Sequence, residues 1–241
     1  MSIILKIISI ILLTFSRKIV DLVLDKFLGE ETVKYDYYCR NHFIWSILIV
    51  VLAILTREFT YTFKFPIEYK QSLKCAVIFI IYIIWGLKSP YLIPEGRKVQ
   101  IWSSFFNPIV EELLFRGIII GIIMLPNKGN VGFNSISEFM YNYVQIISSI
   151  LFMLYHLQYF GYKQVRGSEL IDSLAHLFFV GMMLGATTLF SQSIIYAIVL
   201  HILLNWINIA YRNKYQKATI KDGKYIIELL KKEKENQERS E

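Results

Sequence analysis

The sequence predicts an all-α, polytopic transmembrane helix bundle of about seven spans, with eight as the alternative. Of the 241 residues, 55% are hydrophobic and 15% are aromatic, and the mean hydropathy is +0.45. This composition is too apolar for a water-soluble domain built around one core. The apolar residues also gather in repeated stretches that can cross a bilayer when tilt and flanking aromatic residues extend them. We therefore interpret the chain as an integral membrane protein.

The expected spans follow the apolar stretches in order. They lie near residues 3–15, 43–56, 75–87, 101–125, 143–160, 171–190 and 193–211. The first has only Lys6 as a basic residue and no small-residue cleavage site after it, so we expect a retained span rather than a signal peptide. The eighth crossing would come from 16–35, but the pattern Lys18–Asp25 favours an amphipathic helix at the interface.

The loops predict the orientation of the chain. With seven spans, the segments on one side carry 19 Lys and Arg residues and those on the other carry 5. Because Lys and Arg are enriched in cytoplasmic loops, the C-terminus is expected in the cytoplasm and the N-terminus outside. The net charge of +7 lies beside the spans and is assigned to anionic lipid headgroups, not to nucleic acid.

One membrane domain is expected, in three parts. Residues 1–100 supply N-terminal transmembrane and interfacial helices, 101–211 form the core, and 212–241 form a charged cytoplasmic tail. The apolar patch Tyr225–Leu230 within that tail predicts a short surface helix. Only two cysteines occur, so neither a disulfide framework nor a cysteine-based zinc site is expected.

Three charged residues interrupt the span 101–125. Each of Glu111, Glu112 and Arg116 would cost about 2.5–3.5 kcal/mol at the middle of a membrane if it were unpaired. Glu112 and Arg116 stand four residues apart and so share one helix face, where they can neutralise each other. Glu111 points elsewhere, which leaves one carboxylate for chemistry.

Other polar residues lie in the later apolar segments. His156 lies near the end of one span, and His201 and Asn205 are one turn apart on another, where both can donate hydrogen bonds to a common point. Taken singly, each of these residues could also serve only to form a hydrogen bond to a neighbouring helix. His176 is expected to be a supporting polar residue. Together the carboxylate, the imidazoles and the amide suit activation of water, with no serine or cysteine nucleophile required.

Small residues in the same region predict close helix packing. Gly181 and Gly185 follow Phe178 with the small-xxx-small spacing that lets two backbones approach.

Taken in order, four motifs resemble those of the CAAX protease and bacteriocin-processing (CPBP/Abi) family, including type II CAAX prenyl endopeptidases. They are E-E-x-x-x-R at Glu111, Glu112 and Arg116, F-x-x-x-H at Phe152 and His156, F-x-x-G-x-x-x-G at Phe178, Gly181 and Gly185, and H-x-x-x-N at His201 and Asn205. The resemblance covers about residues 101–210, and the ordered set is more specific than any one motif.

The resemblance implies an intramembrane glutamic endopeptidase that needs no metal or other cofactor. Glu111 and His156 would activate water, His201 and Asn205 would form the oxyanion hole, and Glu112 and Arg116 would have a structural or orienting role. The expected partners are a peptide or lipidated protein substrate and membrane lipids, and the expected location is a bacterial plasma membrane. The substrate and the oligomeric state stay open.

Three alternatives remain at this stage. A zinc peptidase could use His156, His201 and Glu111 as ligands, although the H-E-x-x-H pattern is absent. A proton-coupled or ion-coupled transporter also places ionisable residues inside a bundle, although no inverted repeat is evident. A non-catalytic bacteriocin-immunity or binding protein would keep the residues without turnover.

Overall fold

The computed structural model describes residues 2–28, 34–56, 100–125, 138–164, 168–221 and 224–229, with isolated positions between 74 and 84. Its helices and strands are α1 (Ile3–Thr14), α2 (Ser16–Leu28), α3 (Lys34–Leu55), η1 (Trp102–Phe106), α6 (Asn107–Glu112), η2 (Leu113–Ile119), α7 (Ile120–Met124), α8 (Glu138–Gln164), α9 (Ser168–Ser191), α10 (Ile195–Tyr215), β1 (Gln216–Lys221) and β2 (Lys224–Leu229). Most of the predicted span 75–87 lies outside the described residues.

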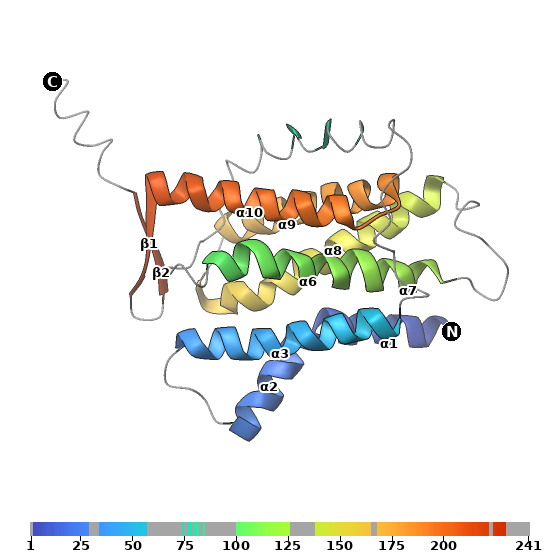
Figure 1. Ribbon diagram of the computed structural model, residues 1–241, viewed down its shortest axis with the longest axis horizontal. Coiled ribbons are helices and arrows are strands. Elements are labelled where there is room, and N and C mark those ends of the chain that lie inside the picture. Colours follow the sequence, from blue (N-terminus) through green and yellow to red (C-terminus); the bar gives the residue numbers. More distant parts are fainter. Residues whose placement is uncertain are drawn as a thin grey trace.

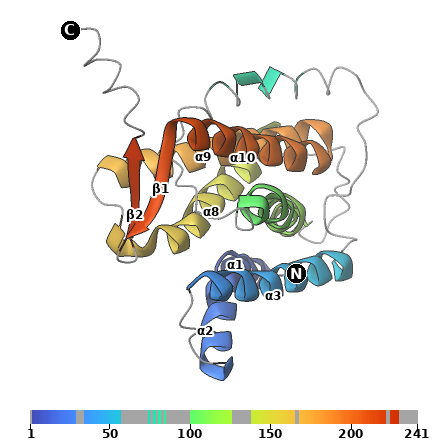
Figure 2. The same ribbon diagram turned by 60° about the vertical axis from the view of Figure 1, so that its left-hand side comes forward.

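The central element is one continuous rod formed by η1, α6, η2 and α7. Figure 2 shows it nearly end-on, with α1 and α3 on one side and α9 and α10 on the other. Residues 110–121 along this rod are all buried. A helix surrounded by protein on every face can carry charged groups whose partners come from neighbouring helices, which explains how the carboxylates at 111 and 112 are accommodated.

Two stretches of the rod are π-helical. η1 precedes Asn107 and η2 follows Glu112, so the short α6 that carries both glutamates lies between them. Pro108 occupies the start of α6, where its missing N–H is tolerated. The rod continues through Pro108 without a break, and a π-helical stretch lies on either side of α6. Such π-helical turns occur frequently at functional sites.

The buried core lies where the rod meets its neighbours. Phe115 packs edge-on against Phe152 of α8 and Tyr155 of α8, and Tyr155 stacks on Trp45 of α3. Trp45 in turn donates a hydrogen bond from Nε1 to Ser16 Oγ at the start of α2. The N-terminal helices are thereby tied to the helices that carry the polar motifs.

The outer faces of the bundle are apolar, as expected of a protein in contact with lipid. Ile4 on α1 is 70% exposed, Leu55 on α3 76% and Trp206 on α10 60%. Among the described residues, one helix, Leu170–Ser191, is both long and apolar enough to cross a membrane, and four shorter apolar helices accompany it. The helical bundle agrees with the predicted fold class, and the number of spans stays a prediction.

The C-terminal tail differs from the prediction. Instead of a surface helix around Tyr225–Leu230, β1 and β2 form an antiparallel hairpin in register from Gln216 opposite Leu229 to Lys221 opposite Lys224 (Figure 1). The sequence between the strands is Asp-Gly, which favours a two-residue hairpin turn, and Ile226 and Ile227 favour strands. The fold is therefore a helical bundle followed by a small hairpin.

Candidate active site

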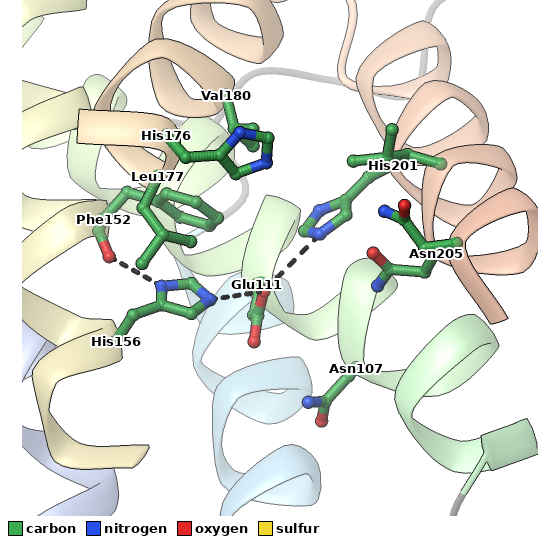
Figure 3. A pocket seen from close by; sticks show the side chains of 11 residues that line it. Asn107, Glu111, Phe152, His156, His176, Leu177, Val180, His201 and Asn205 are labelled. Carbon is green, nitrogen blue, oxygen red and sulfur yellow. Dashed lines mark hydrogen bonds and ion pairs between the residues drawn. The ribbon is translucent and has the colours of Figure 1, made fainter. Parts of the chain in front are cut away.

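Glu111 lies at the meeting point of three helices. It belongs to α6 and is 3% exposed. Its Oε2 atom is 3.8 Å from Nε2 of His156 on α8 and 3.8 Å from Nε2 of His201 on α10 (Figure 3). The structure thus brings together three residues that the sequence places on separate helices. A single carboxylate oxygen faces two imidazole nitrogens at a distance that a small reactant can bridge.

A backbone contact fixes the orientation of His156. Its Nδ1 atom is 2.8 Å from the carbonyl oxygen of Phe152, one turn earlier on α8. Because a carbonyl oxygen only accepts hydrogen bonds, Nδ1 must carry the hydrogen. In the neutral ring, Nε2 then carries the lone pair, and this atom is the one that faces Glu111. His156 is therefore oriented to accept a proton near Glu111 Oε2.

Glu112 sits behind His201. Its Oε1 atom is 2.8 Å from His201 Nδ1 and 3.2 Å from Nη1 of Arg116. Both the Glu112 and Arg116 side chains are fully buried. The pairing of Glu112 with Arg116 that their spacing predicts is present, and one carboxylate oxygen also holds an imidazole from another helix.

Arg116 links this group to α9. Its Nη2 donates a hydrogen bond of 3.1 Å to the carbonyl oxygen of Gly181, and its guanidinium carbon lies 4.5 Å from the centre of the Phe152 ring. Planar guanidinium groups combine several directional hydrogen bonds with stacking on aromatic rings. Arg116 therefore connects α8 and α9 to the rod beside the Glu111 site.

The contact with Glu112 also decides what His201 can do. An ionised carboxylate only accepts, so His201 Nδ1 carries the hydrogen. Nε2, which faces Glu111, bears a hydrogen only when the ring is an imidazolium. His201 can then donate a hydrogen bond to a developing oxyanion, and the Glu112 carboxylate can balance its charge.

Asn205 lies one turn beyond His201, and both residues line the same cavity. Its Nδ2 donates a hydrogen bond of 3.1 Å to the backbone carbonyl oxygen of Ser103 in η1. An amide nitrogen has two hydrogens, so one donor remains after this bond. The structure thus holds Asn205 by one hydrogen and leaves the other for a ligand.

The glycines lie at the contact between α8 and α9. A Cβ on Gly181 would be 3.0 Å from Ser149 Cα, and a Cβ on Gly185 would be 3.2 Å from Gln145 Cγ. Gln145 Nε2 also donates a hydrogen bond of 2.6 Å to Met182 O across this contact. Phe178, in the same motif, is half-buried and contacts Phe179. The close approach at Gly181 places its carbonyl where Arg116 binds.

A small cavity connects the polar groups. Its volume of about 20 Å³ has room for about one water molecule. It is lined by Asn107, Glu111, Phe152, His156, His176, Leu177, Val180, His201, Leu204, Asn205 and Asn208. Glu111, the three histidines and Asn205 are among the residues singled out from the sequence. Asn107 and Asn208 are not, although Asn107 is four residues before Glu111 and Asn208 seven after His201. These spacings keep each asparagine on the same helix face as the predicted residue.

The zinc alternative requires a cluster of ligands. In the part of the chain that the structure describes, no group of three His, Cys, Asp or Glu residues is placed to hold a metal ion.

The fold and the cavity define a class of protein: a bundle of apolar helices with a water-sized cavity lined by carboxylate, imidazole and amide groups. Residues 98–207 match the family model described as "Type II CAAX prenyl endopeptidase Rce1-like". This segment contains all the motifs from Glu111 to Asn205, and the match confirms the resemblance to CAAX proteases. The chain is thus similar to an integral membrane protease family. No curated protein and no solved structure matches it significantly.

Proposed function

We propose that the protein is an intramembrane endopeptidase that hydrolyses a peptide bond in a membrane-associated or lipidated substrate. The observation that carries this proposal is the convergence of His156 Nε2 and His201 Nε2 on Glu111 Oε2, each at 3.8 Å, beside a cavity for one water. A water molecule there would have the polar partners that a buried water needs. The family match over residues 98–207 supports the choice of peptide hydrolysis.

The reaction would begin with this water. Glu111 accepts a proton from it, assisted by Nε2 of His156, while the water oxygen attacks the scissile carbonyl carbon. The C–N bond then breaks, and the proton passes to the leaving amine. The products are a carboxylic acid and an amine, and no atom of the protein becomes covalently attached to the substrate.

Donors on α10 would stabilise the tetrahedral intermediate. The developing oxyanion accepts one hydrogen bond from the second amide hydrogen of Asn205 and one from Nε2–H of His201 as imidazolium. A hydrogen bond of 3.1 Å from Asn205 Nδ2 to Ser103 O holds Asn205 in place, and a contact of 2.8 Å between His201 Nδ1 and Glu112 Oε1 holds His201. Donors fixed before the reaction lower the barrier because they need no reorganisation as the charge develops.

The test is cleavage of a quenched fluorescent peptide by purified protein in detergent. The peptide carries a C-terminal Cys-aliphatic-aliphatic-X sequence and is offered with and without a prenyl group on the cysteine. Glu111→Gln and His156→Ala are each expected to lower kcat by about 10²–10⁴-fold, the range for loss of a general base. Thermal unfolding of each variant establishes that it is folded.

The outcomes separate the alternatives. Activity that survives a strong chelator argues against a zinc peptidase, and activity abolished by the chelator and restored by zinc contradicts the glutamic mechanism. Wild-type cleavage that Glu111→Gln retains in full would also overturn it. Comparison of the two peptides decides whether the lipid is recognised. A folded wild-type protein that cleaves neither peptide favours the immunity or binding alternative.

A further inference from the structure

Asn107 has a buried side-chain oxygen to which no described residue donates a hydrogen bond. Asn107 is only 8% exposed, and its Oδ1 atom is buried without a hydrogen-bond partner among the described residues. It lines the cavity of Glu111, and Figure 3 shows it on the same helix as Glu111, across from Asn205. A buried amide without hydrogen bonds is costly, so it is normally satisfied by protein or by something that enters the site.

Asn208 on α10 extends this polar region. It is 3% exposed and lines the same cavity as Glu111 and Asn107. Asn205 lines this cavity too, and its amide has a second hydrogen beside the one that binds Ser103 O. Three amides therefore line the cavity that Glu111 faces.

The chemistry of these groups indicates the ligand. An asparagine amide has one acceptor and two donors and no charge, which matches the N–H and C=O of a peptide unit. Arg116 faces Glu112 and Gly181 instead. A lipid chain would leave the amides unsatisfied, and an ionic headgroup would find no opposite charge on them. An extended peptide backbone satisfies both ends of each amide.

Resting on the proposed function, we infer that Asn107 and Asn208 form a subsite that binds the peptide backbone of the substrate beside the scissile bond. Asn107 Oδ1 accepts a hydrogen bond from a substrate amide N–H, and Asn208 binds the neighbouring part of the backbone. Four helical residues from Asn107 to Glu111 span about 6 Å. An extended chain advances about 3.3 Å per residue. The bonded N–H therefore belongs to a residue about two positions from the scissile bond.

The experiment pairs protein variants with altered substrates. Asn107→Leu and Asn208→Leu replace each amide by an apolar side chain of similar size. The prenylated quenched peptide is made as a series in which one backbone N–H at a time is replaced by an ester oxygen, from three residues before to three residues after the scissile bond. KM, kcat, the Kd of peptide binding and the unfolding temperature are measured for every pair, so that binding is detected even without cleavage.

For the wild-type protein, we expect one ester position about two residues from the scissile bond to raise KM about tenfold. The same ester should have no further effect on Asn107→Leu, whose KM is already raised with every substrate. Loss of an unsatisfied amide should leave the unfolding temperature of this variant unchanged or higher. Asn41→Leu is the matched control, because Asn41 is buried outside the cavity and donates to Asp25 Oδ1 at 3.4 Å. It should lose stability without a change in KM.

An ester effect of equal size in wild type and Asn107→Leu would overturn the subsite. So would a lower unfolding temperature of Asn107→Leu with unchanged KM, because Asn107 would then act in packing alone. If the wild-type protein binds the peptide series with the Asn107-dependent ester effect but does not cleave it, the proposed hydrolysis fails and the subsite stands. A folded wild-type protein that neither binds nor cleaves the peptides would overturn both the subsite and the proposed hydrolysis.

Discussion

At the scale of single residues, Glu112 has two partners that make different demands on it. It balances the charge of Arg116, and it fixes the hydrogen of His201 on Nδ1. Removal of the first function leaves an unpaired cation inside the protein, which is strongly destabilising. Removal of the second function lets the His201 imidazole adopt the other tautomer. Its Nδ1 then carries no hydrogen and cannot donate a hydrogen bond to residue 112. Stability and activity can therefore be separated by substitution at two positions.

We expect Glu112→Gln to lower the free energy of unfolding by about 3–5 kcal/mol, as for other buried pairs that lose one charge. It should also lower kcat by about 10²–10⁴-fold, because an amide in place of a carboxylate that orients a histidine favours the wrong tautomer. The double variant Glu112→Gln/Arg116→Met removes both charges and should regain most of the stability but not kcat. Denaturant unfolding and the peptide assay measure the two effects. Recovery of kcat in the double variant would contradict the role of Glu112 in orienting His201.

At the scale of helices, the contact between α8 and α9 positions the carbonyl that Arg116 binds. Ser149 packs against Gly181 so closely that a methyl group at Gly181 would be 3.0 Å from the Ser149 backbone. Backbone cannot move aside as a flexible side chain can, so α9 would have to shift. The hydrogen bond from Arg116 to Gly181 O would lengthen with it.

Gly181→Ala is accordingly expected to lower the free energy of unfolding by about 1–3 kcal/mol, the cost of overpacking a close contact. Gly117→Ala is the matched control on the rod, because its new methyl group would meet only Glu112 O, at an ordinary 3.9 Å. Alanine in a helix is more stable than glycine by about 0.5–1 kcal/mol, so this control should be neutral or stabilising. Unfolding in detergent compares the two. Equal stability of both variants would mean that α9 can move without cost.

At the scale of the whole molecule, contacts between residues of one helix could be predicted from the sequence, and contacts between residues of different helices could not. The pair Glu112 and Arg116 follows from four-residue spacing, and the structure contains it. The convergence of His156 and His201 on Glu111 depends on how three helices pack, which periodicity does not encode. The ordered motifs nevertheless named these residues, because a family resemblance carries information about packing that spacing lacks.

The misses also have physical causes. The π-helical turns around α6 leave the apolar pattern of the span intact, so composition does not reveal them. The patch Tyr225–Leu230 is short, and a short apolar run suits a strand as well as a helix; the Asp-Gly before it was the signal for a hairpin. Asn107 lies four residues before Glu111, and this shared helix face was the signal that it lines the cavity.

The number and direction of the spans belong to the whole molecule and can be tested together. An odd number of spans places the termini on opposite sides of the membrane, and an even number places them on the same side. With seven spans, the 19 Lys and Arg residues against 5 predict an outside N-terminus and a cytoplasmic C-terminus. Single cysteines at Ser2→Cys and at Ser240→Cys, in a Cys39→Ser/Cys75→Ser background, report each end separately.

In spheroplasts treated with a membrane-impermeant maleimide, Ser2→Cys should be labelled at once and Ser240→Cys only after permeabilisation. The peptide assay provides the control that each variant is folded. Protection of both cysteines would mean an even number of spans and would favour residues 16–35 as the extra crossing. Labelling of Ser240→Cys alone in intact spheroplasts would reverse the orientation. The basic C-terminal segment would then lie away from the anionic cytoplasmic leaflet, and its charge would need another explanation than lipid headgroups.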